Sequence, residues 1–170
     1  MKLRNLRFLV VLLFCAAGLA GQRQPAADRA IDTSQWKIYR NDKYGFEVKY
    51  PATWVANPGS GSGPDIIALV GGPQVGVTLA IQPNENPKKL SIGQWFAGQL
   101  QEVKATPDAK GNVTIGGQPA VFMENTNSFG TQRAIFTLLH ETDVLSLSYT
   151  RQAQFDPVYA SVVASFRTLK

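Results

Sequence analysis

Three residues that could do chemistry lie close together near the C-terminus. His140, the only histidine of the chain, is followed by Glu141 and Asp143. An imidazole and two carboxylates can hold a divalent cation, so this cluster indicates a metal- or small-ligand-dependent enzyme as one alternative. The same residue types also suit a hairpin turn, where adjacent strand-end residues point to opposite faces. Because no second histidine or distant carboxylate can be identified to complete a metal site, the turn is the preferred interpretation.

A glycine-rich segment between Asn57 and Pro64 is the second candidate site. Its glycines are Gly59, Gly61 and Gly63. A phosphate-binding loop needs the N-terminus of a following helix, whereas here the chain leads into a predicted strand. A surface loop is therefore the preferred interpretation, and we expect Trp54 to pack in the core, as most aromatic residues at strand spacing do. The alternative is a groove for a ligand or peptide, centred on Trp54 and this loop.

The composition excludes several other chemistries. The chain has 170 residues, and its single Cys and single His provide neither an intramolecular disulfide nor a Cys/His zinc site. A Gly-x-Ser-x-Gly nucleophile motif is not present in the sequence. The residues therefore predict no cofactor and no catalytic residue.

The first 20 residues have the pattern of a secretory signal. A positive start (Lys2, Arg4 and Arg7) precedes an apolar run, and Gly18-Leu19-Ala20 supplies the small residues that a signal peptidase requires. As a helix, the run from Phe8 to Ala20 would span about 20 Å, less than the about 30 Å of a bilayer core. We expect cleavage after Ala20 and an exported, periplasmic or extracellular protein without a membrane span. An uncleaved N-terminal anchor is the alternative.

Loss of this segment changes the charge. The chain has 17 Lys and Arg against 12 Asp and Glu, a net charge of +5, and without residues 1–20 the basic count falls to 14 and the net charge to +2. The remaining basic residues are scattered, so a nucleic-acid partner is not predicted. Cys15 follows the bulky Phe14, which matches a lipoprotein signal poorly, so the mature chain is expected to contain no cysteine.

The elements that must position the candidate residues can be read from hydrophobic spacing. Residues 21–35 are expected to be a flexible leader, followed by one folded domain over residues 36–170. Alternating apolar residues predict strands over 36–39, 44–50, 66–70, 75–81, 113–115, 120–125, 133–140 and 144–150. Helical spacing predicts one helix from about Ser91, its expected N-cap, to Lys104. A second helix is predicted to extend toward Phe166 with Asp156 as its N-cap and Pro157 at its first position. Short links between successive strands, such as the turn predicted at Gly116-Gly117, predict antiparallel pairing and an α+β domain.

One stretch of the predicted domain resembles a known family. It reads Tyr39-x-Asn41-x-x-Tyr44-Gly45-Phe46-x-x-x-Tyr50-Pro51-x-x-Trp54, and the last predicted helix contains Val162-x-x-Ser165-Phe166. These motifs resemble the PsbP-like superfamily, which includes the extrinsic PsbP subunit of photosystem II, the Ran-binding Mog factor and bacterial envelope proteins such as the DcrB type. The resemblance covers residues 36–168 and implies an α/β/α sandwich around a mostly antiparallel sheet.

The resemblance also implies a role. Members of this superfamily are mostly accessory or binding proteins, and with the secretory pattern this implies a non-catalytic protein of the bacterial cell envelope with an envelope protein or peptide as partner. A photosystem II-associated assembly factor of the PsbP type and an enzyme using His140 are the alternatives.

Overall fold

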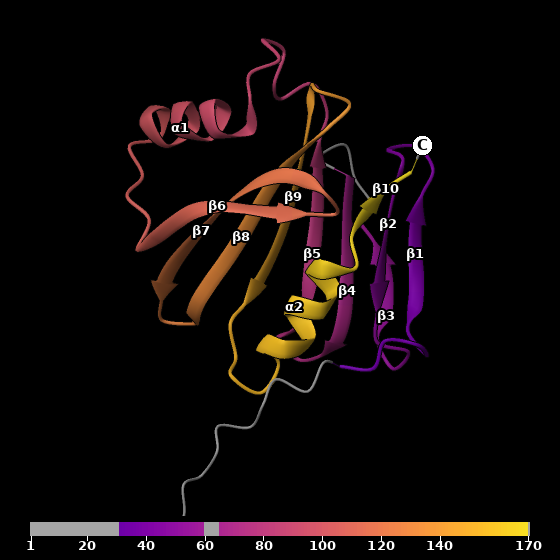
Figure 1. The fold of residues 1–170 in the computed structure, drawn as a ribbon. Coiled ribbons are helices and arrows are strands. Elements are labelled where there is room, and N and C mark those ends of the chain that lie inside the picture. Colours follow the sequence, from indigo (N-terminus) through magenta and orange to yellow (C-terminus); the bar gives the residue numbers. More distant parts are fainter. Residues whose placement is uncertain (1–30, 60–64, 170) are drawn as a thin grey trace, which may run out of the picture. The chain divides into compact units, whose positions relative to one another are not determined.

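The computed structural model describes residues 31–59 and 65–169, which form ten strands and two helices (Figure 1). The strands are β1 (Lys37–Asn41), β2 (Phe46–Tyr50), β3 (Val55–Pro58), β4 (Asp65–Gly72), β5 (Val75–Gln82), β6 (Ala109–Ile115), β7 (Gln118–Asn127), β8 (Gly130–Leu139), β9 (Asp143–Thr150) and β10 (Arg167–Thr168). The helices are α1 (Ile92–Glu102) and α2 (Asp156–Ala164). The predicted signal lies outside the described residues.

Seven strands form one antiparallel sheet in the order β3-β4-β5-β9-β8-β7-β6. The hairpin from β6 to β7 is closed by Gly116 and Gly117, whose φ values of 53° and 77° are those that a two-residue hairpin turn requires at both positions. The glycine pair was predicted to be a turn, and the structure confirms it.

The first two predicted strands do not join this sheet. Instead, β1 and β2 pair with the short C-terminal β10 in a second, three-stranded sheet with the order β1-β2-β10. Neither β3 nor β10 was predicted. β10 has only two residues, and β3 ends in Asn57-Pro58, residue types that indicate a loop.

The large sheet is covered on both faces. On one face, α2 and the small sheet enclose the main core, in which Phe46, Val48, Tyr159 and Val162 are fully buried. On the other face, α1 packs its residues Trp95 and Phe96 against β7, β8 and β9. Figure 1 shows the two helices beside different parts of the sheet. The α+β prediction is confirmed, with a small second sheet beside α2 in the predicted helix layer.

The N-cap of α1 is the predicted residue, whereas the N-cap of α2 lies one residue earlier than predicted. Ser91 is the N-cap of α1 and forms a capping box with Gln94. Serine is favoured at this position because its hydroxyl accepts a hydrogen bond from a free backbone N–H of the first turn. At α2 the N-cap is Phe155, and Asp156, the predicted cap, lies in the first turn, where its carboxylate accepts a hydrogen bond from the backbone N–H of Gln152 at 3.1 Å.

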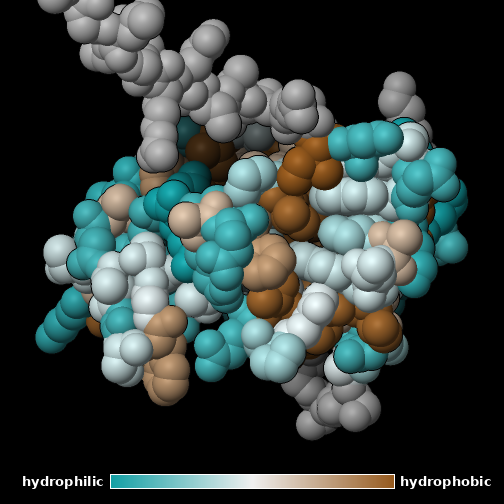
Figure 2. All heavy atoms as spheres, turned by 90° about the horizontal axis from the view of Figure 1, so that it is seen from below, coloured by the Kyte–Doolittle hydropathy of each residue, from teal (hydrophilic) through white to brown (hydrophobic). Residues whose placement is uncertain are grey.

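Several large hydrophobic side chains remain at the surface. They include Ile38, Val55, Ile66, Val70, Leu90, Val103 and Phe129. Figure 2 shows hydrophobic side chains among hydrophilic ones in the middle of the face seen from below. Neither helix within the described ranges is long and apolar enough to span a membrane.

Candidate functional site

A cavity of about 690 Å³ lies where the turn between β8 and β9 meets the segment that leads into α1. Its apolar wall includes Leu90, Leu138, Leu139 and Leu169, and its polar residues include Lys89, His140 and Glu141. We refer to it as the His140 cavity. A concave site of this size with apolar walls and a few polar groups is typical of ligand or peptide binding.

The backbone around this cavity is strained. Lys89, His140 and Glu141 have φ values of 50°, 51° and 65°, in the left-handed region that favours glycine. For other residues this conformation costs on the order of 1–2 kcal/mol each. Three such residues lining one cavity indicate that the surrounding structure imposes the conformation, and backbone strain of this kind concentrates at functional sites.

The strained turn is held by a buried asparagine. Asn86 is 1% exposed, and its side-chain amide donates hydrogen bonds to the carbonyl oxygens of Leu90 at 2.8 Å and of Glu141 at 2.9 Å. Its side-chain oxygen accepts from the Leu90 N–H, and its backbone N–H donates to the Thr142 carbonyl at 2.8 Å. Asn86 therefore ties the segment before α1 to the turn between β8 and β9.

The charged side chains at the cavity are oriented by their neighbours. The Lys89 ammonium donates to the Glu141 carboxylate at 2.9 Å, and this hydrogen bond lowers the pKa of Glu141 and raises the pKa of Lys89. Both groups are exposed, so their attraction is screened by water. His140 Nδ1 lies 3.9 Å from Asp143 Oδ2, while Asp143 Oδ1 accepts from the backbone N–H of Asn84.

Tyr44 closes another side of the His140 cavity. It is 5% exposed, and its hydroxyl donates to the Asp65 carboxylate at 2.6 Å. Lys43 donates to the same carboxylate oxygen at 2.6 Å. The hydrogen bonds from Lys43 and then Tyr44 lower the pKa of Asp65, and desolvation raises the pKa of Tyr44. The hydroxyl of Tyr44 is thus held by Asp65 from outside the family-like motif, while its backbone N–H donates to the Asn41 side-chain oxygen within the motif.

The predicted metal ligands do not converge. The Glu141 carboxylate contacts Lys89, away from the pair formed by His140 and Asp143. Within residues 31–59 and 65–169, no group of three or more His, Cys, Asp or Glu side chains is placed to hold a metal ion. The hydroxyl of Ser91, which also lines the cavity, is engaged with Gln94 in the helix cap.

At Trp54 the alternative of a groove is corrected, because the side chain packs in the core as the preferred interpretation expects. Trp54 is 5% exposed and belongs to the main core, with its ring centroid 6.2 Å from that of Tyr159. A side chain at Gly71 would collide with the Trp54 indole, so Gly71 lets the sheet approach this ring. The Gly59 N–H donates to the Ile66 carbonyl at 2.6 Å, which closes the strand pair. Gly61 and Gly63 lie outside the described residues.

Two residues of the site were not predicted. Asn86 and Lys89 occur in a segment rich in proline, asparagine and lysine, which indicates only a loop. Their importance comes from contacts with a turn more than 50 residues further along the chain. Pro83 and Pro87, on either side of Asn86, indicate a loop but not the turn that it contacts.

Comparison with known proteins identifies the fold. No family model matches the sequence, and a comparison with curated protein sequences finds no match. Cyanobacterial PsbP (CyanoP) from Synechocystis sp. PCC 6803 is similar in structure, with a TM-score of 0.53, 16% identity, and coverage of 78% of this chain and 92% of that protein.

Two weaker structural similarities were found. One is to a protein of Bacteroides thetaiotaomicron VPI-5482, with a TM-score of 0.48 and 15% identity over 80% of this chain and 49% of that one. The other is to a Pseudomonas aeruginosa protein of unknown function, with a TM-score of 0.44 and 15% identity over 76% of this chain and 94% of that one.

The DcrB type within the superfamily stays a prediction. The similarity to CyanoP, together with the buried Tyr-Gly-Phe motif, establishes that the chain has a PsbP-like fold.

Proposed function

We propose that this protein is a non-catalytic accessory protein of the bacterial cell envelope, which binds a protein or peptide partner at the His140 cavity. The secretory pattern of residues 1–20 supports the location. The PsbP-like fold is compatible with an accessory role but identifies no partner.

The observation that carries the proposal is the strained backbone around the cavity. Lys89, His140 and Glu141 all adopt left-handed φ values, and the buried Asn86 holds the turn in place. A hairpin that only connected two strands would be more stable with glycine or asparagine at these positions. Retaining His140 and Glu141 there presents an imidazole and a carboxylate at a fixed position beside an apolar wall.

The chemistry of the cavity suits a peptide segment with an apolar side chain. Leucine side chains from the segment before α1, from β8 and from the C-terminal residues provide the apolar wall. The imidazole and the exposed pair of Lys89 and Glu141 can donate to and accept from peptide groups at the edge. Such a pairing of an apolar anchor with a polar rim is typical of protein recognition sites.

The export part of the proposal is tested with the full chain in a Gram-negative host. We expect the protein in the periplasmic fraction with Gly21 as its first residue, and an Ala20→Arg variant to retain its N-terminus because the peptidase needs a small residue there. Ala26→Arg serves as the control and should be processed normally. Recovery of uncleaved wild-type protein from the cytoplasm would contradict export.

The binding part is tested by affinity capture from the envelope extract of the source cells, with His140→Ala compared with the wild-type protein. We expect a partner that the wild-type protein retains and the variant loses, while the thermal unfolding temperature of the variant does not fall. Lys110→Ala, an exposed substitution outside the cavity, is the matched control. Equal retention by wild type and His140→Ala, or no specific partner at all, would rule out this site.

A further inference from the structure

A second cavity lies beneath α2 and shares no lining residue with the His140 cavity. It has a volume of about 380 Å³ and is bounded by β6, β8, β9 and one side of α2. Its apolar walls are formed by Val113 and Ile115 on one side and by Ala160, Val163 and Ala164 on the other. We refer to it as the α2 cleft.

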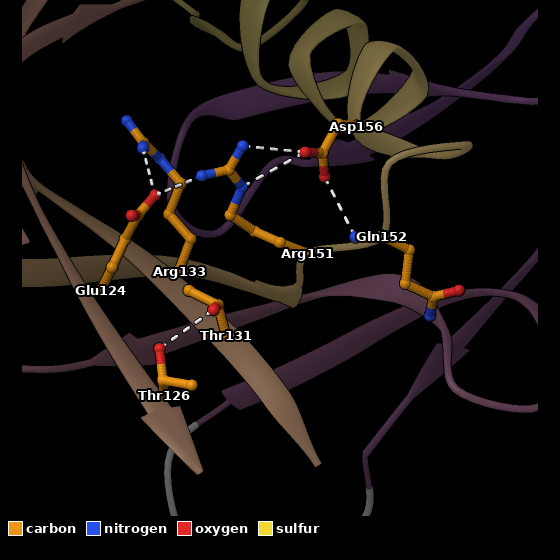
Figure 3. Close-up of polar contacts among 7 residues, drawn as sticks. All are labelled: Glu124, Thr126, Thr131, Arg133, Arg151, Gln152 and Asp156. Atoms are coloured by element: carbon orange, nitrogen blue, oxygen red, sulfur yellow. Dashed lines mark hydrogen bonds and ion pairs between the residues drawn. The ribbon is translucent and has the colours of Figure 1, made fainter. Parts of the chain in front are cut away.

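The polar end of the α2 cleft contains two arginines held by two carboxylates, as Figure 3 shows. Glu124 Oε1 accepts from Arg133 Nη1 at 2.6 Å and from Arg151 Nη1 at 3.4 Å. Arg151 also donates to Asp156 Oδ2, from Nε at 3.2 Å and from Nη2 at 2.9 Å. The two guanidinium groups are thus fixed side by side by Glu124 of β7 and Asp156 of α2.

Arg133 is the more enclosed of the two arginines. Its side chain is 23% exposed, against 44% for Arg151, and its guanidinium carbon lies 4.0 Å from the centroid of the Phe122 ring. Among the described residues it donates one hydrogen bond, to Glu124. A guanidinium has more N–H donors than that, so a half-buried Arg133 retains donors for a further acceptor.

The unused N–H donors of the two arginines indicate which kind of ligand group fits. The four contacts to Glu124 and Asp156 use only part of the N–H groups of the two arginines. An additional acceptor is therefore favoured over an additional cation. Planar guanidinium groups are well suited to bind a carboxylate, and the apolar walls would bury an aliphatic group attached to it.

We propose that the α2 cleft binds a small amphipathic carboxylate, with its acid group on Arg133 and Arg151 and its aliphatic part between β6 and α2. The cleft lies within the size range of small-molecule sites. Both a free aliphatic acid and the carboxyl terminus of a peptide with an apolar last residue have this chemistry. This site would act in addition to the partner site proposed above.

The probes are hexanoate and N-acetyl-leucine, titrated into the mature protein and followed by amide chemical shifts in NMR. Hexanol and N-acetyl-leucinamide are the uncharged controls. We expect at least one acid to shift the amides of Val113, Arg133 and Ala160, and the matching uncharged compound to bind at least about tenfold more weakly because it cannot engage the guanidinium groups. Tighter binding of hexanoate would indicate a free aliphatic acid as the ligand, and tighter binding of N-acetyl-leucine would indicate the carboxyl terminus of a peptide.

Two variants test the two parts of the site separately. Arg133→Met removes the charge while Glu124 keeps its contact with Arg151, and Arg40→Met, an exposed arginine elsewhere, is its control. Ala160→Phe fills the apolar part and leaves all four ionic contacts in place, with the exposed Ala105→Phe as its control. Each cleft variant should weaken binding of the acid at least about tenfold, and each control should leave it unchanged.

Three results would overturn the proposal. They are binding of neither acid to the wild-type protein, binding of an uncharged control as tightly as its acid, and undiminished binding by Ala160→Phe. If Arg133→Met does not fold, Ala160→Phe and the uncharged controls decide the question.

Discussion

Asn86 links two segments that are distant in the sequence, and its removal should show how much that link contributes. In Asn86→Ala the carbonyls of Leu90 and Glu141 and the Leu90 N–H lose their partner. We expect a loss of about 1–3 kcal/mol in the free energy of unfolding, the range for a buried polar group left without its hydrogen bond. Urea unfolding measures it, and Asn125→Ala, at an exposed position of β7, is the control. A loss no larger than that of the control would contradict the role given to Asn86.

Asp65 should make the stability depend on acid pH. Lys43 and Tyr44 lower its pKa in the folded protein, so the charged form stabilises the fold. This contribution is complete well above the unfolded-state pKa of about 3.9 and is lost as the pH falls through that value toward the lower folded-state pKa. Asp65→Asn should therefore be less stable than wild type at neutral pH, with a difference that shrinks on acidification. Thermal unfolding between pH 7 and pH 3 measures it, and a constant difference would contradict the expectation.

Glycines in two different elements should respond in opposite directions to the same substitution. Gly116 has a left-handed φ of 53°, and a Cβ there would lie 2.5 Å from the Phe166 carbonyl oxygen, so Gly116→Ala strains the hairpin between β6 and β7. Gly98 lies within α1, where an added Cβ meets nothing within 4 Å. We expect Gly116→Ala to destabilise by more than about 1 kcal/mol and Gly98→Ala to stabilise by up to about 1 kcal/mol.

Denaturant unfolding of the two glycine variants provides the measurement, and each serves as the control for the other. A change of the free energy of unfolding in the same direction for both variants would contradict the expectation that the hairpin turn requires glycine and the helix does not. A stabilised Gly98→Ala protein would also show that α1 tolerates a stiffer backbone beside the segment that leads into the His140 cavity.

At the scale of the whole molecule, the two cavities occur where separate elements meet. The His140 cavity is lined by residues preceding α1, by the end of β8 and by the C-terminal residues. The α2 cleft is lined by one helix and three strands. Neither cavity belongs to a single motif, so each depends on how the helices are placed on the sheet. We expect that the two binding activities can be removed separately, because His140→Ala and Ala160→Phe alter different cavities.

Local patterns in the sequence determined most of the elements. Alternation between apolar and polar residues predicted β2, β4, β5, β7, β8 and β9, and helical spacing predicted α1 and α2. These predictions succeeded because side chains in a strand or helix alternate between core and solvent with a period that can be read along the chain. The Gly116-Gly117 turn was predictable because both positions require a positive φ.

The tertiary structure decided the partners of these elements and the sites between them. Periodicity identifies which face of a strand is buried but not which sheet it joins, so the separation of β1 and β2 from the large sheet was not predictable. The aromatic residue type of Trp54 was compatible with a groove or a core, and only packing against Tyr159 placed it in the core. Lys89 meets Glu141, and Arg151 meets Glu124, through contacts between residues that are 52 and 27 positions apart in the chain, which no local spacing records.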